Sequence, residues 1–574
     1  VCAAAACLLA SALPSSAQFD TATVVGTVKD NSGGVVPGAT VTLTNLDTGV
    51  TSVHTTDGTG SYEFVTVRIG RYKVTAELQG FSTAVADGFQ VTVGARQRVD
   101  LQLSPGQVTE TVQVTGAAAV LETDSSQRAH LITSRQAVEL PLNTREYSAL
   151  ALLTPGVKQS SLNQGSGTNN REGSFNVNGM RSTFNNFLLD GLDNNSYGTS
   201  NQGFSNQVIQ PSPDAVAEFK VVTNNMSAEY GRAGGATVNV AYKSGTNRYT
   251  GAAWEFYRDT ALNATGFFKP TSGVKPTLEK NQFGGTFGGP IIRNKAFFFA
   301  DAEVWRQTRK QVAFQTIPNP TERQGILKVD VRNPQTGDVY PAGTPIPMTA
   351  FARKVLSGLP DPTRPELVGN NYDLLQNFEY NTYKYGGKVD YQASERLSMF
   401  ARFGYRNVDS HDQPPLPLPS GGAGNGNIYV RAKQVATGFT FARSGSSLLE
   451  GRFGWSRTEA GKNPPGLGSE PIQSMYGITG LPSDARIAGG LNTQLLTGWS
   501  SYGRQETNPQ WQYPEVLTAK LNYTWLQHRH SLKAGYEFQF IKTEVQDVNP
   551  LYGRDTYSGQ FTRPPGAAAN NLYN

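Results

Sequence analysis

The sequence predicts a mainly β chain: a small N-terminal β-sandwich, a small α/β domain, and the first part, about nine strands, of a transmembrane antiparallel β-barrel. Three observations lead to this prediction. Turn-forming residues are abundant, with 61 glycines and 32 prolines among 574 residues, whereas charged residues reach only 17%. Many segments of the second half alternate apolar and polar side chains. The connections between these segments are alternately long and short.

The composition also excludes several classes of protein. The length exceeds what one hydrophobic core supports, so several domains are expected. The 50 basic and 45 acidic side chains give a net charge of +5 without a long basic run, so nucleic acid is not an expected partner. No stretch has the roughly 18 consecutive apolar residues of a membrane helix, but alternating membrane strands average out as polar and stay possible.

The first residues have the character of a secretory signal. An apolar stretch contains both cysteines, Cys2 and Cys7, and is followed by Ser15 and Ala17, the small residues that signal peptidase requires. We therefore expect a signal peptide over 1–17 that is incomplete at its N-terminus, since no Met or charged start precedes it. A mature chain without cysteine fits the bacterial envelope.

Residues 21–105 have the pattern of a small β-sandwich, in which short Val-, Thr- and Tyr-rich segments recur between turn residues. Glycines at 31–34 and 57–60 supply the positive φ angles that tight turns need. The expected strands are 23–29, 39–45, 52–56, 61–67, 71–77, 89–93 and 98–103.

The motif residues of this region resemble the carboxypeptidase regulatory-like domain. They are Gly26, Asp30, Gly33, Pro37, Gly38, Ala39, Thr56, Asp57, Gly60, Tyr62, Phe64, Gly70 and Tyr72. The resemblance implies a transthyretin-like β-sandwich without catalytic residues. Because this fold is grouped with starch-binding, carbohydrate-binding-like folds, glycan contact stays open beside a structural or docking role.

A β-competent segment, 106–116, follows the sandwich and resembles the TonB box. Through this strand, TonB-dependent outer-membrane receptors pair with the energising periplasmic protein TonB. The role needs a free strand edge, because main-chain hydrogen bonds carry the affinity. An eighth strand of the sandwich and an ordinary linker are the alternatives. The implied TonB-contact residues are Glu110, Thr111, Val112, Gln113 and Val114.

Residues 117–245 resemble the plug domain of the same receptors, above all at 176–181, 186–191 and 234–247. The resemblance implies a small mixed α/β core inside a barrel lumen. The implied ligand and plug residues are Asn176, Asn178, Arg181, Asp190, Asp193 and Asn194. The last three lack the regular spacing of a calcium loop, so we expect turn residues that bond nearby backbone amides and no metal site.

From 246 to 574 the amphipathic strands indicate the barrel. Ala401 and Phe403, for example, alternate with Arg402 and Gly404, so one face suits lipid and the other a watery lumen. A soluble sandwich with one buried face has the same alternation, but it has no reason to alternate its connection lengths. The long connections are 258–281, 309–380, 408–428 and 458–514, and the short ones are 292–295, 392–396, 443–447 and 527–531.

Two further features concern the barrel. The aromatic and glycine-rich segments 283–290 and 297–299 resemble the first barrel strands of the Oar-like branch of these receptors. Closed bacterial barrels have an even number of strands, and plugged transporters have many more than the roughly nine found here. We therefore expect the barrel to be truncated at its C-terminus.

These resemblances imply a receptor in the bacterial outer membrane, surrounded by its lipid, with the N-terminal domain in the periplasm. It would bind an external ligand (an iron chelate, cobalamin, an oligosaccharide or a peptide) and import it with energy transmitted by TonB and its inner-membrane energising complex. Loops in 308–380 and 458–514 would contact the ligand first. The alternative is a structural or adhesive surface protein whose barrel is not energised.

The residues give little support to an enzyme. The five histidines, at 54, 130, 411, 528 and 530, lie in no metalloprotease or Ser-His-Asp context, and no phosphate-binding loop motif occurs. We therefore expect no enzymatic activity, no catalytic residue, no cofactor and no metal.

Overall fold

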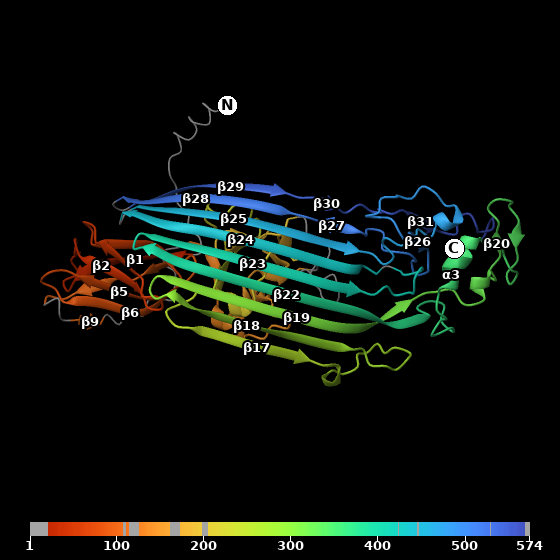
Figure 1. Cartoon of the computed structure of the whole chain (residues 1–574), viewed down its shortest axis with the longest axis horizontal. Coiled ribbons are helices and arrows are strands. Elements are labelled where there is room, and N and C mark those ends of the chain that lie inside the picture. Colours follow the sequence, from red (N-terminus) through yellow and green to blue (C-terminus); the bar gives the residue numbers. More distant parts are fainter. Residues whose placement is uncertain are drawn as a thin grey trace, which may run out of the picture.

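The computed structural model describes residues 21–106, 111–113, 126–160, 173–197, 205–422, 424–444, 447–527 and 530–568. Figure 1 shows the N-terminal strands at one end, the long strands along the middle, and loops with the helix α3 (Ala350–Ser357) at the other end. The expected signal peptide, 1–17, lies outside the described residues. No helix in the described part is long and apolar enough to cross a membrane.

The N-terminal domain is the predicted sandwich of two sheets. Alternate residues of its strands, such as Val24, Val41, Phe64 and Val74, are buried between the sheets. One sheet contains β1 (Thr21–Asp30), β4 (Ser61–Arg68), β7 (Arg96–Arg98) and β8 (Leu101–Leu103). The other contains β2 (Thr40–Asn45), β3 (Thr51–Thr55), β5 (Gly70–Glu77), β6 (Thr83–Val91) and β9 (Thr111–Gln113). The sixth strand starts earlier than predicted, at Thr83.

Strand β9 falls within the TonB-box-like segment. It pairs in parallel with β6, with Thr111 opposite Thr83 and Gln113 opposite Val85. These three residues thus adopt the alternative of a further sandwich strand, while Glu110 and Val114 lie outside the described residues. Among the described strands only β6 pairs with β9, so β9 is an edge strand.

The next domain is a small α/β unit. Its five-stranded sheet has the order β10-β15-β16-β13-β14. Side chains such as Tyr147, Phe187 and Phe219 form its core, and the helix α2 begins with a capping box between Thr133 and Gln136. The strands of this sheet and the helix are β10 (Arg128–Thr133), α2 (Ser134–Glu139), β13 (Asn186–Leu189), β14 (Leu192–Asp193), β15 (Val216–Asn224) and β16 (Thr237–Tyr242). A separate two-stranded sheet contains β11 (Val157–Gln159) and β12 (Phe175–Val177).

Nine long antiparallel strands in chain order form the barrel wall within the described residues. They are β17 (Thr250–Arg258), β18 (Leu278–Ile292), β19 (Ala296–Gln315), β22 (Tyr372–Ser394), β23 (Leu397–Asp412), β24 (Gly426–Ser444), β25 (Ser447–Asn463), β28 (Glu515–Gln527) and β29 (His530–Lys542). The connections are alternately long and short, as predicted. The barrel is not closed, because β17 and β29 do not pair with each other in the described part.

The two faces of the wall differ as the alternation predicts. Phe403 is 48% exposed on the outer face, whereas the neighbouring Arg402 is buried against the α/β domain. Strand β17 behaves differently: the rings of Trp254 and Phe256 lie 4.9 and 4.8 Å from the guanidinium of Arg145 in the α/β domain. These two rings therefore face the α/β domain, where a cation over a ring face is a favourable contact.

The long connections pack together into a loop cap, which we define as the described residues of 316–371, 413–425, 464–514 and 543–568. Ile317, Val355, Leu359, Leu416, Leu491 and Tyr502 form a hydrophobic cluster of its own within the cap. The cap lies at the opposite end of the wall from the N-terminal sandwich (Figure 1).

Candidate functional site

The site lies where the α/β domain meets the barrel wall, and it starts from a hairpin turn. Asp190 and Gly191 connect β13 to β14, and both have positive φ angles, 50° and 75°. Asp-Gly is a preferred pair for a two-residue turn with this backbone, so the local sequence favours the hairpin. The turn places the Asp190 side chain at the tip, facing the wall.

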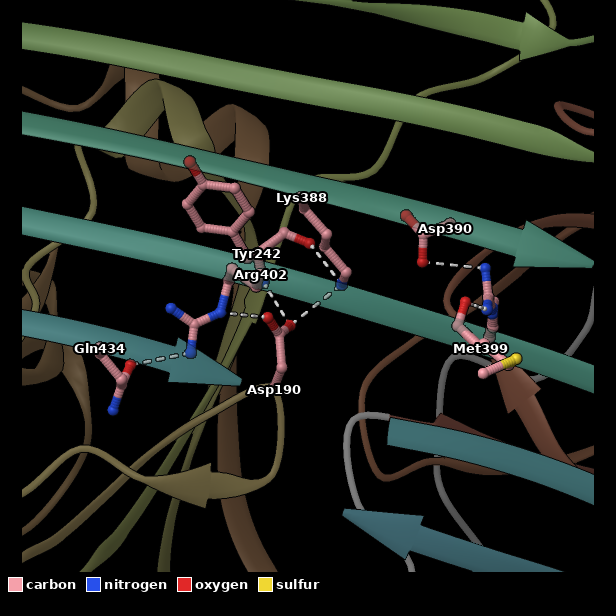
Figure 2. Close-up of polar contacts among 8 residues, drawn as sticks. Asp190, Tyr242, Lys388, Asp390, Met399, Arg402 and Gln434 are labelled. Atoms are coloured by element: carbon pink, nitrogen blue, oxygen red, sulfur yellow. Dashed lines mark hydrogen bonds and ion pairs between the residues drawn. The ribbon is translucent and has the colours of Figure 1, made fainter. Parts of the chain in front are cut away.

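The Asp190 carboxylate is completely buried between two cations of the wall (Figure 2). Its Oδ1 accepts hydrogen bonds from Lys388 Nζ at 3.2 Å and from the backbone N–H of Tyr242 at 3.0 Å. Its Oδ2 accepts one from Arg402 Nε at 2.8 Å. Lys388 and Arg402 are themselves buried, with 6% and 1% of their side chains exposed, so this ion-pair group is shielded from solvent.

A third strand joins the same group. Arg402 Nη2 donates to Gln434 Oε1 at 2.8 Å, and Gln434 Nε2 donates to the carbonyl of Asp193 at 2.9 Å. One hairpin is thereby bonded to β22, β23 and β24. We call Asp190, Lys388, Arg402 and Gln434 the latch. Removing one partner of such a buried pair costs about 3–5 kcal/mol, because the remaining charge stays buried.

A second polar group holds another loop of the α/β domain. Arg145 bonds Asp214 of its own domain, and its Nε donates to Glu303 Oε2 of β19 at 3.1 Å. Lys384 Nζ of β22 donates to the other Glu303 oxygen at 3.2 Å. The domain is thus fixed to the wall at two separate places by polar contacts.

Two of the predicted site residues are satisfied within their own loop. The Asp193 carboxylate accepts hydrogen bonds from the backbone and side chain of Asn195, at 3.0 and 2.9 Å, and from the Tyr197 hydroxyl at 2.7 Å. The Asn194 amide bonds both backbone groups of Ile209. Both side chains therefore bond groups within the α/β domain.

The other predicted residues lie away from the latch. Asn176 is in the short strand β12 (Phe175–Val177), and Asn178 has a φ of 50° and donates to the carbonyl of Thr223 at 3.2 Å. Arg181 is exposed. Of the six predicted residues, only Asp190 contributes a side chain to the ion pairs of the latch; Asp193 contributes its carbonyl.

Sequence reasoning missed the wall residues of both polar groups: Lys388, Arg402, Gln434, Glu303 and Lys384. The sequence did contain one indication of these five residues, because each of them occupies an inward-facing position of an amphipathic strand. Polar side chains at such positions face the lumen and are therefore candidates for contact with whatever fills it.

The N-terminal sandwich docks beside the latch. Arg68 Nη1 donates to Asp390 Oδ1 of β22 at 3.0 Å. The Val93 N–H donates to Glu218 of β15, and Lys220 Nζ of the same strand donates to the carbonyl of Gly94 at 3.4 Å. Burial raises the pKa of the Glu218 carboxyl to about 7.

Comparison with known proteins agrees with this three-part architecture. The carboxypeptidase regulatory-like domain matches residues 23–104, and the TonB-dependent receptor plug domain matches 122–238. The outer membrane beta barrel domain matches 241–574, more than half of the chain. The chain belongs to the outer-membrane β-barrel family of TonB-dependent receptors. It is an outer-membrane protein whose N-terminal domain lies toward the periplasm, and the α/β domain is its plug.

Individual relatives are distant. The TonB-dependent transporter Oar of Myxococcus xanthus is 26% identical over 301 residues, which cover 50% of this chain and 27% of that protein. The outer membrane transporter YddB of Escherichia coli has a TM-score of 0.45 at 13% identity, over 73% of this chain and 48% of that one. The ferric enterobactin receptor of Pseudomonas aeruginosa has a TM-score of 0.44 at 12% identity, over 73% and 50%. The chain spans half the length of these proteins or less.

Proposed function

We propose that this receptor binds an external ligand at its loop cap and imports it through the barrel, with TonB supplying the force that moves the plug. The observation that carries the proposal is the edge strand β9, which lies in the TonB-box-like segment between the sandwich and the plug. An edge strand offers a row of main-chain donors and acceptors to which a strand of TonB can add.

The chemistry of the plug–wall contacts supports plug movement. The latch and the Arg145 group consist of ion pairs and hydrogen bonds, and the wall residues face the lumen. Water entering a lumen can replace such polar contacts one by one, whereas a large apolar interface would resist hydration. A pulling force therefore has to break these buried ion pairs, together with small apolar contacts such as that of Leu192 with Phe400 and Ala436.

Binding of TonB to the full chain in detergent tests the proposal. The variant Val112→Pro removes a backbone donor within β9, and Val112→Ala is the matched control that keeps it. We expect Val112→Pro to weaken binding of the periplasmic domain of the host's TonB at least tenfold, and Val112→Ala to bind like the unaltered chain. Absence of TonB binding to the unaltered chain would favour the structural or adhesive alternative.

A further inference from the structure

The loop cap contains a cavity of about 250 Å³ far from the latch and from the N-terminal domain. Its walls combine apolar side chains, among them Leu418, Ile472 and Leu491, with two cationic residues, Lys354 and Arg504. Lys354 is exposed on helix α3 at the cavity, and Arg504 is only 3% exposed. A mainly apolar hollow with a few convergent polar groups is the usual form of a ligand site.

Arg504 is held rigidly but its charge is not balanced. Its Nη1 donates to the carbonyl of Gly489 at 3.1 Å, its Nη2 donates to that of Ile487, and its guanidinium lies 3.8 Å from the centroid of the Tyr552 ring. Its Nε is buried with no hydrogen-bond partner in the described structure. The contacts identified for Arg504 include two carbonyls and a ring but no carboxylate.

A buried guanidinium without a carboxylate partner favours the binding of an anion. Burial lowers the pKa of the Arg504 guanidinium to about 10, so it is still charged at neutral pH. Carbonyl dipoles and a ring face compensate a full charge only partly, and a buried donor without a partner costs about 1–3 kcal/mol. A carboxylate in the cavity, which Arg504 lines, would balance this charge.

The size of the cavity restricts the occupant. At about 30 Å³ per water, its volume corresponds to about eight water molecules. It is slightly smaller than the roughly 300–1,000 Å³ of pockets that enclose a whole drug-sized ligand. It therefore suits one terminal group of a larger molecule, with an apolar body against Leu418, Ile472 and Leu491.

We propose that this cavity is a recognition site for a carboxylate on an aliphatic body, as the C-terminal residue of a peptide presents it. Arg504 bonds the carboxylate, Lys354 attracts it at the mouth, and the apolar walls hold the side chain. The biological role of the site rests on the proposed receptor function, but occupancy of the cavity does not require TonB.

The test measures binding of the tripeptide Gly-Gly-Leu to the full chain in detergent by ligand-observed NMR, with the C-terminal amide of the same peptide as the matched probe. We expect the free acid to bind at least about tenfold more tightly than the amide, and Arg504→Gln to remove this preference. Arg504→Lys keeps the positive charge, so this variant should retain part of the preference for the free acid. Inorganic phosphate should not compete, because it lacks the aliphatic body.

Equal binding of acid and amide, or an unchanged preference in a folded Arg504→Gln variant, would overturn the proposal. Should Arg504→Gln unfold the cap, Leu418→Trp decides: a ring at the cavity wall should abolish acid-selective binding, and retained binding contradicts the site. TonB binding, measured in parallel, separates the two hypotheses. Acid-selective peptide binding without TonB binding supports this site and refutes the energised receptor.

Discussion

Replacing Asp190 by Asn removes the central charge of the latch without changing much else. The Asn side chain has nearly the same shape, and Asn tolerates the positive φ of 50° at this position. The backbone turn and the N–H bond from Tyr242 can therefore persist. What changes is that Lys388 and Arg402, both buried, lose the carboxylate that lies between them.

The expected cost follows from this uncompensated charge. Loss of one partner of a buried ion pair costs about 3–5 kcal/mol. Since each 1.36 kcal/mol is a factor of ten in an equilibrium constant, the opening equilibrium of the hairpin should rise by about two to four powers of ten. The barrel wall itself should be unaffected, because its strands keep their own ladder of backbone hydrogen bonds.

Hydrogen exchange followed by mass spectrometry measures this local opening directly. The peptide to follow is 186–194, which contains the hairpin, with a peptide from β23 as the internal reference. The matched control is Asp193→Asn in the same hairpin. Burial raises the pKa of the Asp193 carboxyl, so its ionised form is already disfavoured and a neutral amide should be tolerated better.

A double variant tests whether the charge is the cause. In the Asp190→Asn background, Lys388→Met removes one of the two buried cations that have lost their carboxylate partner. It should therefore destabilise the hairpin less in that background than in the unaltered chain. Protection of 186–194 that falls less than tenfold in Asp190→Asn, or no more than in Asp193→Asn, would refute the latch as the main attachment of the plug hairpin.

Two further predictions concern the neighbourhood of the latch. Gly191→Ala places a Cβ on a residue with a φ of 75°, so it should destabilise the hairpin by roughly 1–2 kcal/mol, measured by thermal unfolding of the plug. A loss of stability below about 0.3 kcal/mol would contradict the turn geometry. For the sandwich, burial raises the pKa of Glu218 from 4.5 to about 7, so its contribution to docking is full below pH 4.5 and lost as the pH rises through about 7. Hydrogen exchange at 89–95, corrected for the intrinsic exchange rate, should therefore show tighter docking at pH 5 than at pH 8, and Glu218→Gln should abolish this difference.

Local patterns in the sequence were sufficient for much of the architecture. The side-chain alternation around Arg402 and the alternately long and short connections predicted the barrel wall, because both depend on strand geometry alone. Asp190-Gly191 predicted a turn because that pair accepts positive φ angles. The sandwich strands were placed by the turns that separate them, apart from the early start of β6 and the division of the expected strand 98–103 into β7 and β8.

The contacts that hold the parts together depended on the tertiary structure. Asp190 meets Lys388 and Arg402 about two hundred residues further along the chain, and no spacing rule connects a plug turn to a particular lumen-facing position. The same limit applies to β9, whose β-competent sequence suits an edge of the sandwich as well as a strand of TonB. Periodicity reports which face of a strand a side chain occupies. Which partner that face meets depends on how domains dock and loops pack, and for Asp190, Arg504 and β9 only the folded chain decides it.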